Sequence, residues 1–385
     1  MKKIAVVTGT RAEFGLLKPL IDQIFRGNRY QLQLIVTAMH LSPEFGYTIQ
    51  EIEKDGYPIA KKIECLLSSD TAVGITKSVG LAMIGFADAI DELKPDLIFI
   101  LGDRSEMLAA ATAAMFANIP IAHIHGGETT EGAYDEGIRH AITKMSSLHF
   151  ASTEIYRKRI IQLGEHPDRV FNVGAIGLDS IRNLKLLSRE DFEKSIGFNL
   201  SKRNILITYH PVTLENNSAE EQFKAVLNVF RTLEETHFIF THANSDRDGR
   251  IINHMISQFV AENNEIAIEF RSLGQLRYLS CIQYMDMIVG NSSSGILEVP
   301  YFNVPTINIG DRQKGRVMPE SVINTLPNET EIAAAIIKGL STEFRDRIKN
   351  QKQHYGNGDT VNQIMKVLSD LPSVDIKKAF FNLKF

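Results

Sequence analysis

Apolar, β-branched runs alternate along the chain with segments whose apolar residues recur at helical spacing. This alternation predicts parallel strands joined by crossover helices. The predicted strands of the first half are IAVVTG, LQLIVTA, DLIFILGD, IPIAHIHGG, LHFAST and VFNVG. Those of the second half are NILITYH, HFIFTHA, EIAIEF, DMIVGN and PTINIG. The fold class expected from this pattern is α/β, with two doubly wound, Rossmann-like domains.

A polar stretch, LKLLSREDFEKSIGFNLSKRN, separates the two series of strands. It lacks a clear apolar stripe, so we place the domain junction around residues 175 to 200. The chain of 385 residues is long enough for two domains, and 44% of its residues are hydrophobic.

Charge and cysteine content narrow the class of partner. Lys and Arg number 42 against 46 Asp and Glu, a net charge of −4, which gives no electrostatic support to nucleic-acid or membrane-surface binding. Cys65 and Cys281 have no metal or redox spacing, which fits a reducing, cytoplasmic compartment. No segment is expected to reach the roughly 20 apolar residues of a membrane span. A small-molecule partner is expected.

The first candidate site is the turn in VTGTRAEFG. Backbone N–H groups at the start of the following helix attract anions, and Arg11 can add a bidentate donor for a phosphate. The alternative is an ordinary strand-to-helix turn with a surface arginine. The dinucleotide fingerprint G-x-G-x-x-G is absent here, so no redox cofactor is indicated.

A second loop, in VGNSSSGILEV, is more specific. Ser292, Ser293 and Ser294 offer hydroxyl and N–H groups, and Gly295 permits close backbone approach to a pyrophosphate. Glu298, one helical turn further on, can accept hydrogen bonds from ribose hydroxyls. A simple helix cap needs one serine rather than three, so nucleotide binding is the favoured interpretation.

Two further strand ends carry titratable groups. ILGDRSE places Asp103 beside Arg104, as a catalytic base or as a structural ion pair. TYHPVT places His210 where it can contact a leaving phosphate, or where it simply bonds to backbone.

The densest cluster is HIHGGETTEGAYDEGIRHAITK. Strand alternation predicts His123 and His125 on one face, followed by a sharp glycine turn. A helix from YDEG onward places Asp135 and Arg139 on one face, so one loop can present both of them with His125 and Glu128. The alternatives are a zinc site, for which H-x-H-x-x-E is a weak signature, and a solvated helix face. Because ligands bind outside the carboxyl ends of parallel strands, all these groups are expected in one cleft.

With these motifs assembled, the chain resembles the hydrolysing UDP-N-acetylglucosamine 2-epimerases of bacterial sialic acid biosynthesis. The resemblance spans about residues 1 to 365 and rests on TGTRAEFG, LGDR, HIHGGE, DEGIRHAITK, HPVT, GNSSSGILEVP and INIGDRQKGR. It implies two Rossmann-like domains facing a cleft, as in glycosyltransferases of the B type. The expected domains are an N-terminal sugar-binding and catalytic domain (1–180), a UDP-binding domain (200–358), and a C-terminal helix and tail (359–385) that return to the first domain.

The resemblance also implies roles for the site residues. The residues that hold UDP would be Arg11, His210, Asn244, Ser292, Ser293, Glu298 and Arg312. The residues that line the sugar would be Asp103, His125, Asp135 and Arg139, with Arg104 and Glu128 as further members. Many relatives have Glu at the position of His125, so a glutamate role is not transferred there.

The implied reaction is anti elimination of UDP across C1 and C2 of the sugar, followed by hydration of the 2-acetamidoglucal. Asp103 and Asp135 would act as base or acid, His125 as a proton shuttle, and His210 would assist diphosphate departure. No metal or redox cofactor is required, and a homodimer is expected from the family. The same chemistry on a 2,4-diacetamido-2,4,6-trideoxy sugar, as in legionaminic acid biosynthesis, is an alternative. More distant alternatives are a glycosyltransferase and a non-catalytic sugar-nucleotide sensor.

Overall fold

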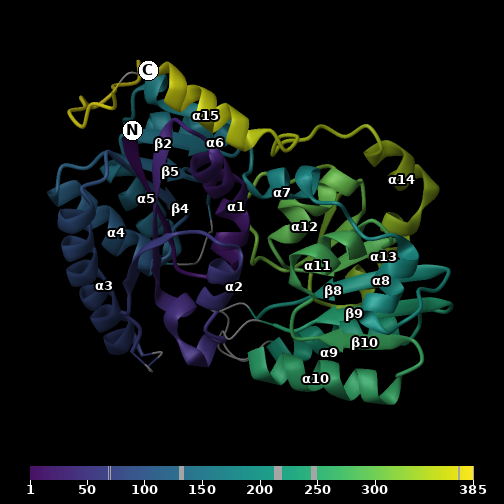
Figure 1. The fold of residues 1–385 in the computed structure, drawn as a ribbon. Helices are drawn as coiled ribbons and strands as arrows, with labels where there is room; N and C mark the ends of the chain where they lie inside the picture. The colour runs from purple at the N-terminus through teal and green to yellow at the C-terminus, as the bar shows by residue number, and fades with distance from the viewer. Residues whose placement is uncertain are drawn as a thin grey trace. The chain divides into compact units, whose positions relative to one another are not determined.

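The computed structural model describes residues 1–67, 69, 71–129, 134–211, 219–243, 249–371 and 373–384. The chain forms two compact α/β units, both visible in Figure 1. Unit 1 comprises Met1–Glu128, Tyr134–Arg182 and Tyr355–Phe385, and unit 2 comprises Thr129–Ala133 and Asn183–His354.

The sheet of unit 1 is parallel throughout the described residues. Its strands are β1 (Lys2–Thr8), β2 (Tyr30–Thr37), β3 (Ile59–Ile63), β4 (Leu97–Leu101), β5 (Ile121–Ile124), β6 (Leu148–Ala151) and β7 (Val170–Asn172). They are ordered β3-β2-β1-β4-β5-β6-β7. The order reverses between β1 and β4, and at such a switch point the loops after two neighbouring strands diverge and leave a crevice.

Helices cover both faces of this sheet. They are α1 (Arg11–Arg26), α2 (Ile49–Lys54), α3 (Ala72–Leu93), α4 (Ser105–Phe116), α5 (Asp135–Met145), α6 (Glu154–Gln162), α7 (Gly177–Asn183) and α15 (Thr360–Asp370), with short 3₁₀ turns η1 (Ala38–Leu41), η2 (Pro43–Phe45) and η3 (Pro167–Arg169). The last helix, α15, belongs to unit 1 although it follows all of unit 2 in the chain (Figure 1).

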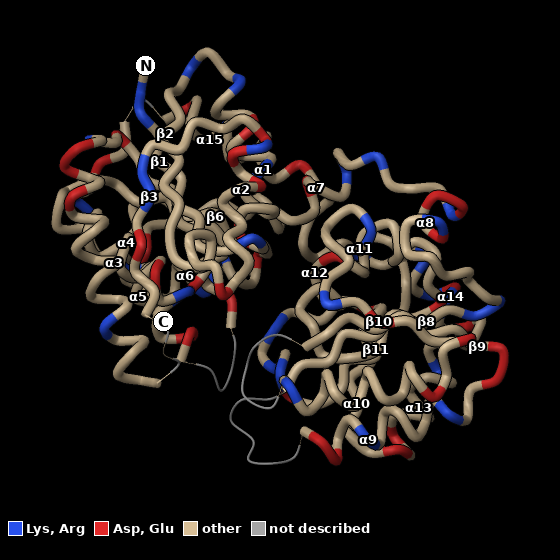
Figure 2. Tube along the Cα trace, turned by 60° about the horizontal axis from the view of Figure 1, so that its bottom comes forward, with Lys and Arg blue, Asp and Glu red and all other residues tan. Residues whose placement is uncertain are grey.

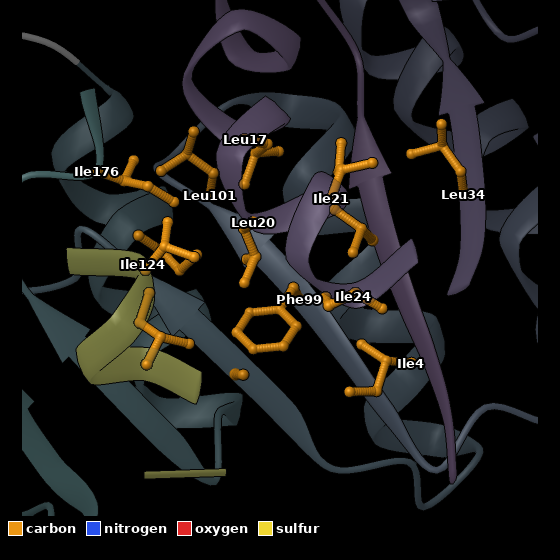
Figure 3. Close-up of a cluster of buried hydrophobic side chains, with 14 of the residues drawn as sticks. Ile4, Leu17, Leu20, Ile21, Ile24, Leu34, Phe99, Leu101, Ile124 and Ile176 are labelled. Atoms are coloured by element: carbon orange, nitrogen blue, oxygen red, sulfur yellow. The ribbon is translucent and has the colours of Figure 1, made fainter. Parts of the chain in front are cut away.

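One face of the sheet is sealed by α1 and α15. Figure 3 shows Leu17, Leu20 and Ile24 of α1 directed toward Phe99 of the central strand β4. Ile364 of α15 belongs to the same buried cluster. Full burial of each such side chain stabilises the folded state by about 1.5–3 kcal/mol. This face therefore supplies a rigid base for the loops at the strand ends.

The other face is sealed by α3 and α4. An 18-residue window of α3 has a mean hydropathy of 1.4, so by length and composition α3 is a candidate membrane span among the described helices. A core helix meets the same criterion, and Phe86 and Ile90 of α3 are buried in a cluster with Ile98 and Ile100 of β4. A third of that window is buried.

Unit 2 repeats the design with a second parallel sheet. Its strands are β8 (Arg203–Thr208), β9 (Thr236–Thr241), β10 (Ala267–Phe270), β11 (Met287–Gly290), β12 (Thr306–Ile309) and β13 (Val322–Thr325). Their order is β10-β9-β8-β11-β12-β13, so the switch point lies between β8 and β11.

The helices of unit 2 again cover both faces of the sheet's central strands. They are α8 (Arg189–Ile196), α9 (Ala219–Phe230), α10 (Gly249–Glu262), α11 (Gly274–Ile282), α12 (Ser294–Leu297), α13 (Glu329–Leu340) and α14 (Thr342–Ile348), with the 3₁₀ turn η4 (Val299–Phe302). Aromatic packing dominates one side, where Phe230, Phe238, Phe240 and Phe259 meet at ring distances of 4.9–6.4 Å.

The strand predictions are confirmed for every run named from the sequence, and two strands were missed. β3 and β13 are edge strands of four or five residues, and β3 carries Lys61 and Lys62. Charged residues at an exposed sheet edge prevent it from pairing with another chain. The same residues interrupt the apolar pattern from which a strand is predicted. Figure 2 shows acidic and basic residues interspersed over both units.

Candidate active site

The turn after β1 is held by the side chains of α1 itself. Thr10 Oγ1 accepts from the N–H of Glu13, while Glu13 Oε2 accepts from the N–H groups of Gly9 and Thr10 at 2.8 and 3.2 Å. This is a capping box. The N–H groups of Gly9, Thr10 and Glu13 therefore already have partners, and anion binding at this turn stays a prediction.

Arg11 follows this cap and points away from it. Its Nε donates to Glu51 Oε2 at 2.9 Å, and about half of the Arg11 side chain is exposed. Arg11 is thus available to exchange its carboxylate partner for a phosphate, at little cost in stability.

A buried carboxyl pair, Glu13 and Glu106, lies behind the turn, and no sequence motif points to it. Burial, reinforced by the charge of Glu106, raises the pKa of Glu13 to about 8. Glu106 Oε1 accepts from Arg104 Nε at 2.7 Å, and Asp135 lies close enough to Arg104 for their charges to interact. Arg104 therefore holds the buried Glu106, and its charge also acts on Asp135 at the start of α5.

Asp103 is fixed by the neighbouring helix α5. Arg139 of α5 forms an ion pair with Asp103 and donates to the carbonyl oxygen of Glu128 and to Glu136 Oε2, both at 2.9 Å. The Arg139 side chain is 3% exposed, whereas that of Asp103 is 23% exposed. Arg139 is thus a buried support, and Asp103 is the partner that can meet a substrate.

His125 is bound at both ring nitrogens. The N–H of Ile176 donates to Nε2 at 3.2 Å, so this nitrogen carries the lone pair and Nδ1 carries the proton. Nδ1 lies 3.4 Å from Glu128 Oε1, which also accepts from Ser152 Oγ at 2.7 Å. Because Nε2 is occupied, this imidazole cannot accept a further proton without losing the contact to Ile176, which argues against the proton-shuttle role.

The prediction that His123 and His125 share a face is also wrong. β5 ends at Ile124, and His125 has a φ of 64°, a left-handed conformation that breaks strand alternation. His123 is fully buried, with Nε2 2.8 Å from Gly102 O and Nδ1 3.2 Å from Thr143 Oγ1 of α5. Burial lowers the pKa of His123 to about 3, so it is a neutral structural residue.

In unit 2, the loops after β8 and β11 are joined by Asn291. Its Oδ1 accepts from the N–H of His210, and its Nδ2 donates to His210 O, both at 2.7 Å. The carbonyl oxygen of Asn291 accepts from Arg312 Nη1 at 3.2 Å and from Gln313 Nε2 at 2.9 Å. Asn291 thus brings His210 and Arg312 to one switch point. Asn291 stands in the quoted GNSSSG motif, but no role was predicted for it.

The serine loop is compact and leads into a single short turn. Ser292 and Ser293 precede α12, and Tyr278 donates to Ser294 Oγ at 2.8 Å. A Cβ added to Gly295 would lie 2.7 Å from Thr306 Cγ2, so glycine is required for the close approach to β12. Glu298 ends α12, where burial raises its pKa.

Each unit therefore carries one part of the predicted set. Unit 1 holds Arg11, Asp103, Arg104, His125, Glu128, Asp135 and Arg139, and unit 2 holds His210, Ser292, Ser293, Ser294, Gly295, Glu298 and Arg312. Asn244 lies outside the described residues. Within the described part of the chain, no group of three or more His, Cys, Asp or Glu side chains is arranged to hold a metal ion.

The two units define an α/β protein with a glycosyltransferase-B-like fold, and a solved structure supports that class. The UDP-GlcNAc 2-epimerase from Neisseria meningitidis bound to UDP-GlcNAc superposes with a TM-score of 0.82 at 19% identity, over 96% of this chain and 100% of that one.

The family follows from the sequence comparison. A family model described as UDP-N-acetylglucosamine 2-epimerase matches residues 22–369, and the chain belongs to this family. It is 43% identical to the Campylobacter jejuni GDP/UDP-N,N'-diacetylbacillosamine 2-epimerase (hydrolyzing), over 99% of both chains. It is 38% identical to the Escherichia coli polysialic acid biosynthesis protein P7, over 96% of this chain and 94% of that protein.

Proposed function

We propose that this enzyme is a hydrolysing 2-epimerase of a nucleotide-activated 2-acetamido sugar. It would release the nucleoside diphosphate and a free sugar that is inverted at C2. The observation that carries the proposal is the partly exposed Asp103 carboxylate, oriented by the buried Arg139 beside Arg104 and Asp135. Abstraction of a weakly acidic C2 proton requires a carboxylate that is held in a fixed orientation.

The proposed reaction has two balanced steps. In the first, a carboxylate takes the proton from C2, the C1–O bond breaks, and the diphosphate leaves, which gives the 2-acetamidoglucal. In the second, water adds its hydroxyl group to C1 while a proton is returned to the opposite face of C2. Asp103 and Asp135 are the candidate acid and base for these transfers.

The diphosphate is assigned to unit 2. His210, Arg312 and the loop of Ser292 and Ser293 supply donors for it, and Asn291 holds these elements together. Within unit 2, Glu298 would accept from the ribose hydroxyls. These donors stabilise the negative charge that develops on the leaving group.

We propose UDP-2,4-diacetamido-2,4,6-trideoxyglucose, which is UDP-N,N'-diacetylbacillosamine, as the preferred substrate. The support is the name of the relative that is 43% identical over nearly the whole chain. UDP-N-acetylglucosamine, consumed in sialic acid biosynthesis, is the second candidate. It is supported by the description of the family model and by the relationship to polysialic acid protein P7.

A substrate panel tests the proposal. The enzyme is incubated separately with UDP-N-acetylglucosamine and with the UDP and GDP forms of diacetylbacillosamine. Phosphorus and proton NMR follow the free diphosphate and the configuration of the sugar at C2, with Asp103→Asn as the inactive control. A C2-inverted free sugar supports the proposal. Transfer of the sugar to an added acceptor with C2 unchanged would indicate a glycosyltransferase, and UDP binding without any turnover would indicate a sensor.

We propose in addition that the enzyme is a cytoplasmic homodimer. Leu81 and Ile84 of α3, with Met115 and Phe116 at the end of α4, are exposed on one side of unit 1 and are suited to pack against a second copy. The buried free thiols of Cys65 and Cys281 fit a reducing compartment. Light scattering on Ile84→Glu tests the dimer: a shift to monomer is expected, and an unchanged mass would exclude this face.

A further inference from the structure

The C-terminal tail of unit 1 lies against the end of the helix that carries Arg139. After α15 the chain continues, and Lys378 Nζ donates to the carbonyl oxygen of Ser146, directly after α5, at 2.7 Å. Arg169 of η3 donates to two carbonyl oxygens that lie earlier in the tail. They are those of Asp375 and Lys377, at 2.6 and 3.4 Å. The tail is therefore held at this helix end by Lys378 and, separately, by Arg169.

Glu165 is the centre of this contact. Its carboxylate, 1% exposed, accepts from Lys378 at 2.8 Å and from His149 Nε2 at 3.1 Å, and it also accepts from Lys144 in the last turn of α5. Burial alone would raise the pKa of Glu165, but the hydrogen bonds from His149, Lys144 and Lys378 lower it to about 2. One buried carboxylate thus ties the tail to α5 and to β6.

An aromatic residue completes the contact. The Phe380 ring lies over Gly164 so closely that an added Cβ would come within 2.3 Å of it, and the backbone of Gly164 has a φ of 91°. Phe381 N–H donates to Gly164 O at 2.9 Å, and Lys144 Nζ lies 5.0 Å from the centroid of the Phe380 ring. Cation–π and packing contacts of this kind stabilise the attachment of the tail, although the Phe380 side chain is 63% exposed.

We propose that the tail Asp375–Phe381 is a positioning clamp, which fixes the C-terminal end of α5 and thereby sets the alignment of Arg139, Asp103 and Asp135. The helix has 11 residues and is about 16 Å long, short enough to move as a rigid rod. Thr143 anchors it to His123 on the sheet, and the clamp fixes the end beyond that anchor.

The effect on the proposed reaction would be selective. A displacement of α5 by ~1 Å changes the orientation of the Asp103 carboxylate, and misalignment of this size can lower turnover by up to ~100-fold. The clamp contacts lie within unit 1, whereas the diphosphate is assigned to residues of unit 2. Loss of the clamp should therefore lower kcat while the affinity for UDP stays unchanged. This consequence for kcat rests on the proposed function.

Two variants and one matched control test the clamp. Lys378→Met removes the charged donor but keeps most of the aliphatic stem, and Phe380→Ala removes the ring from a largely exposed site. Lys377→Ala is the control, because among the described residues no hydrogen bond or ion pair involves the Lys377 side chain. Hydrogen–deuterium exchange measures α5 in each full-length protein. Turnover and UDP binding by calorimetry are measured in parallel.

The expected result is exchange at residues 140–146 at least ~5-fold faster in both test variants than in the control. In addition, kcat should fall at least ~10-fold with KM and the Kd of UDP within ~2-fold of the unmodified values. Unchanged exchange in both variants would overturn the clamp, and faster exchange with unchanged kcat would overturn its positioning role. If the unmodified enzyme converts no nucleotide sugar, the proposed function and this positioning role both fail, and the exchange data still decide whether the tail fixes α5.

Discussion

Arg139 on α5 and Asp103 after β4 form an ion pair in which the arginine is buried and the carboxylate is partly exposed. The other guanidinium nitrogen of Arg139 donates to the carbonyl oxygen of Glu128 and to Glu136. The planar fork of the guanidinium group thus connects the loop after β4 with the loop after β5. A lysine presents a single point charge and cannot make these contacts in the same geometry.

Replacement of the two candidate carboxylates should therefore abolish most turnover. We expect Asp103→Asn and Asp135→Asn each to lower kcat at least ~100-fold, because an amide cannot accept the C2 proton. Arg139→Lys should also lower kcat, since the orientation of Asp103 is lost. Glu154→Gln is the control, because Glu154 forms an exposed ion pair with Arg157 on α6 and has no proposed role toward substrate. Near-normal kcat in both carboxylate variants would remove them from the chemistry.

His125 should behave as a structural residue. His125→Ala leaves the N–H of Ile176 and the carboxylate of Glu128 without an imidazole partner, so we expect the free energy of unfolding to fall by about 2–3 kcal/mol. His125→Asn should lose less, because asparagine tolerates a positive φ and its amide can both donate and accept. Urea unfolding measures both variants. A variant of full stability with strongly reduced kcat would restore the proton-shuttle role.

The buried carboxyl Glu13 predicts a pH dependence of stability. Its pKa is about 8 in the folded protein against an ordinary 4.5, so the folded state binds more protons between these values. Stability therefore falls as pH rises from about 4.5 to about 8. In Glu13→Gln this contribution should vanish, and the melting temperature should depend less on pH than in the exposed control Glu44→Gln. Parallel pH profiles of the two variants would contradict the assignment.

The packing of the serine loop can be tested by a compensating pair. The Cβ in Gly295→Ala meets Thr306 Cγ2, which displaces the loop, and overpacking of this kind costs about 1–3 kcal/mol. We expect UDP binding, measured by calorimetry, to weaken ~10-fold or more. Thr306→Ser removes the methyl group in conflict and should restore binding in the double variant. No rescue would indicate that Gly295 is needed for another reason.

The sequence predicted the parts of this fold that depend on local pattern. Buried strands such as β4 and β11 are continuous apolar runs, and polar residues directly after each run mark the end of the strand. Both features are local in sequence, so they do not depend on tertiary packing. The edge strands β3 and β13 were not predicted, because edge positions tolerate polar residues that interrupt the apolar pattern.

The sequence provides candidate residues for the site, but it does not reveal the contacts that join them. The positions of Asp103 and Arg139 followed from the spacing of their motifs, whereas the proximity of Glu13 and Glu106 depends on tertiary packing. The position of His125 depends on a single left-handed residue, which no alternation rule anticipates. Asn291 was visible in its motif, but its two hydrogen bonds to His210 span 81 positions in the chain.

The most direct test of the proposed chemistry is the fate of hydrogen at C2. The enzyme is incubated in heavy water with UDP-N,N'-diacetylbacillosamine and, separately, with UDP-N-acetylglucosamine, and the free sugar is analysed by proton NMR. Elimination followed by hydration predicts a C2-inverted sugar that carries one deuterium at C2 for every diphosphate released. A released sugar that retains its original hydrogen at C2 would contradict the account.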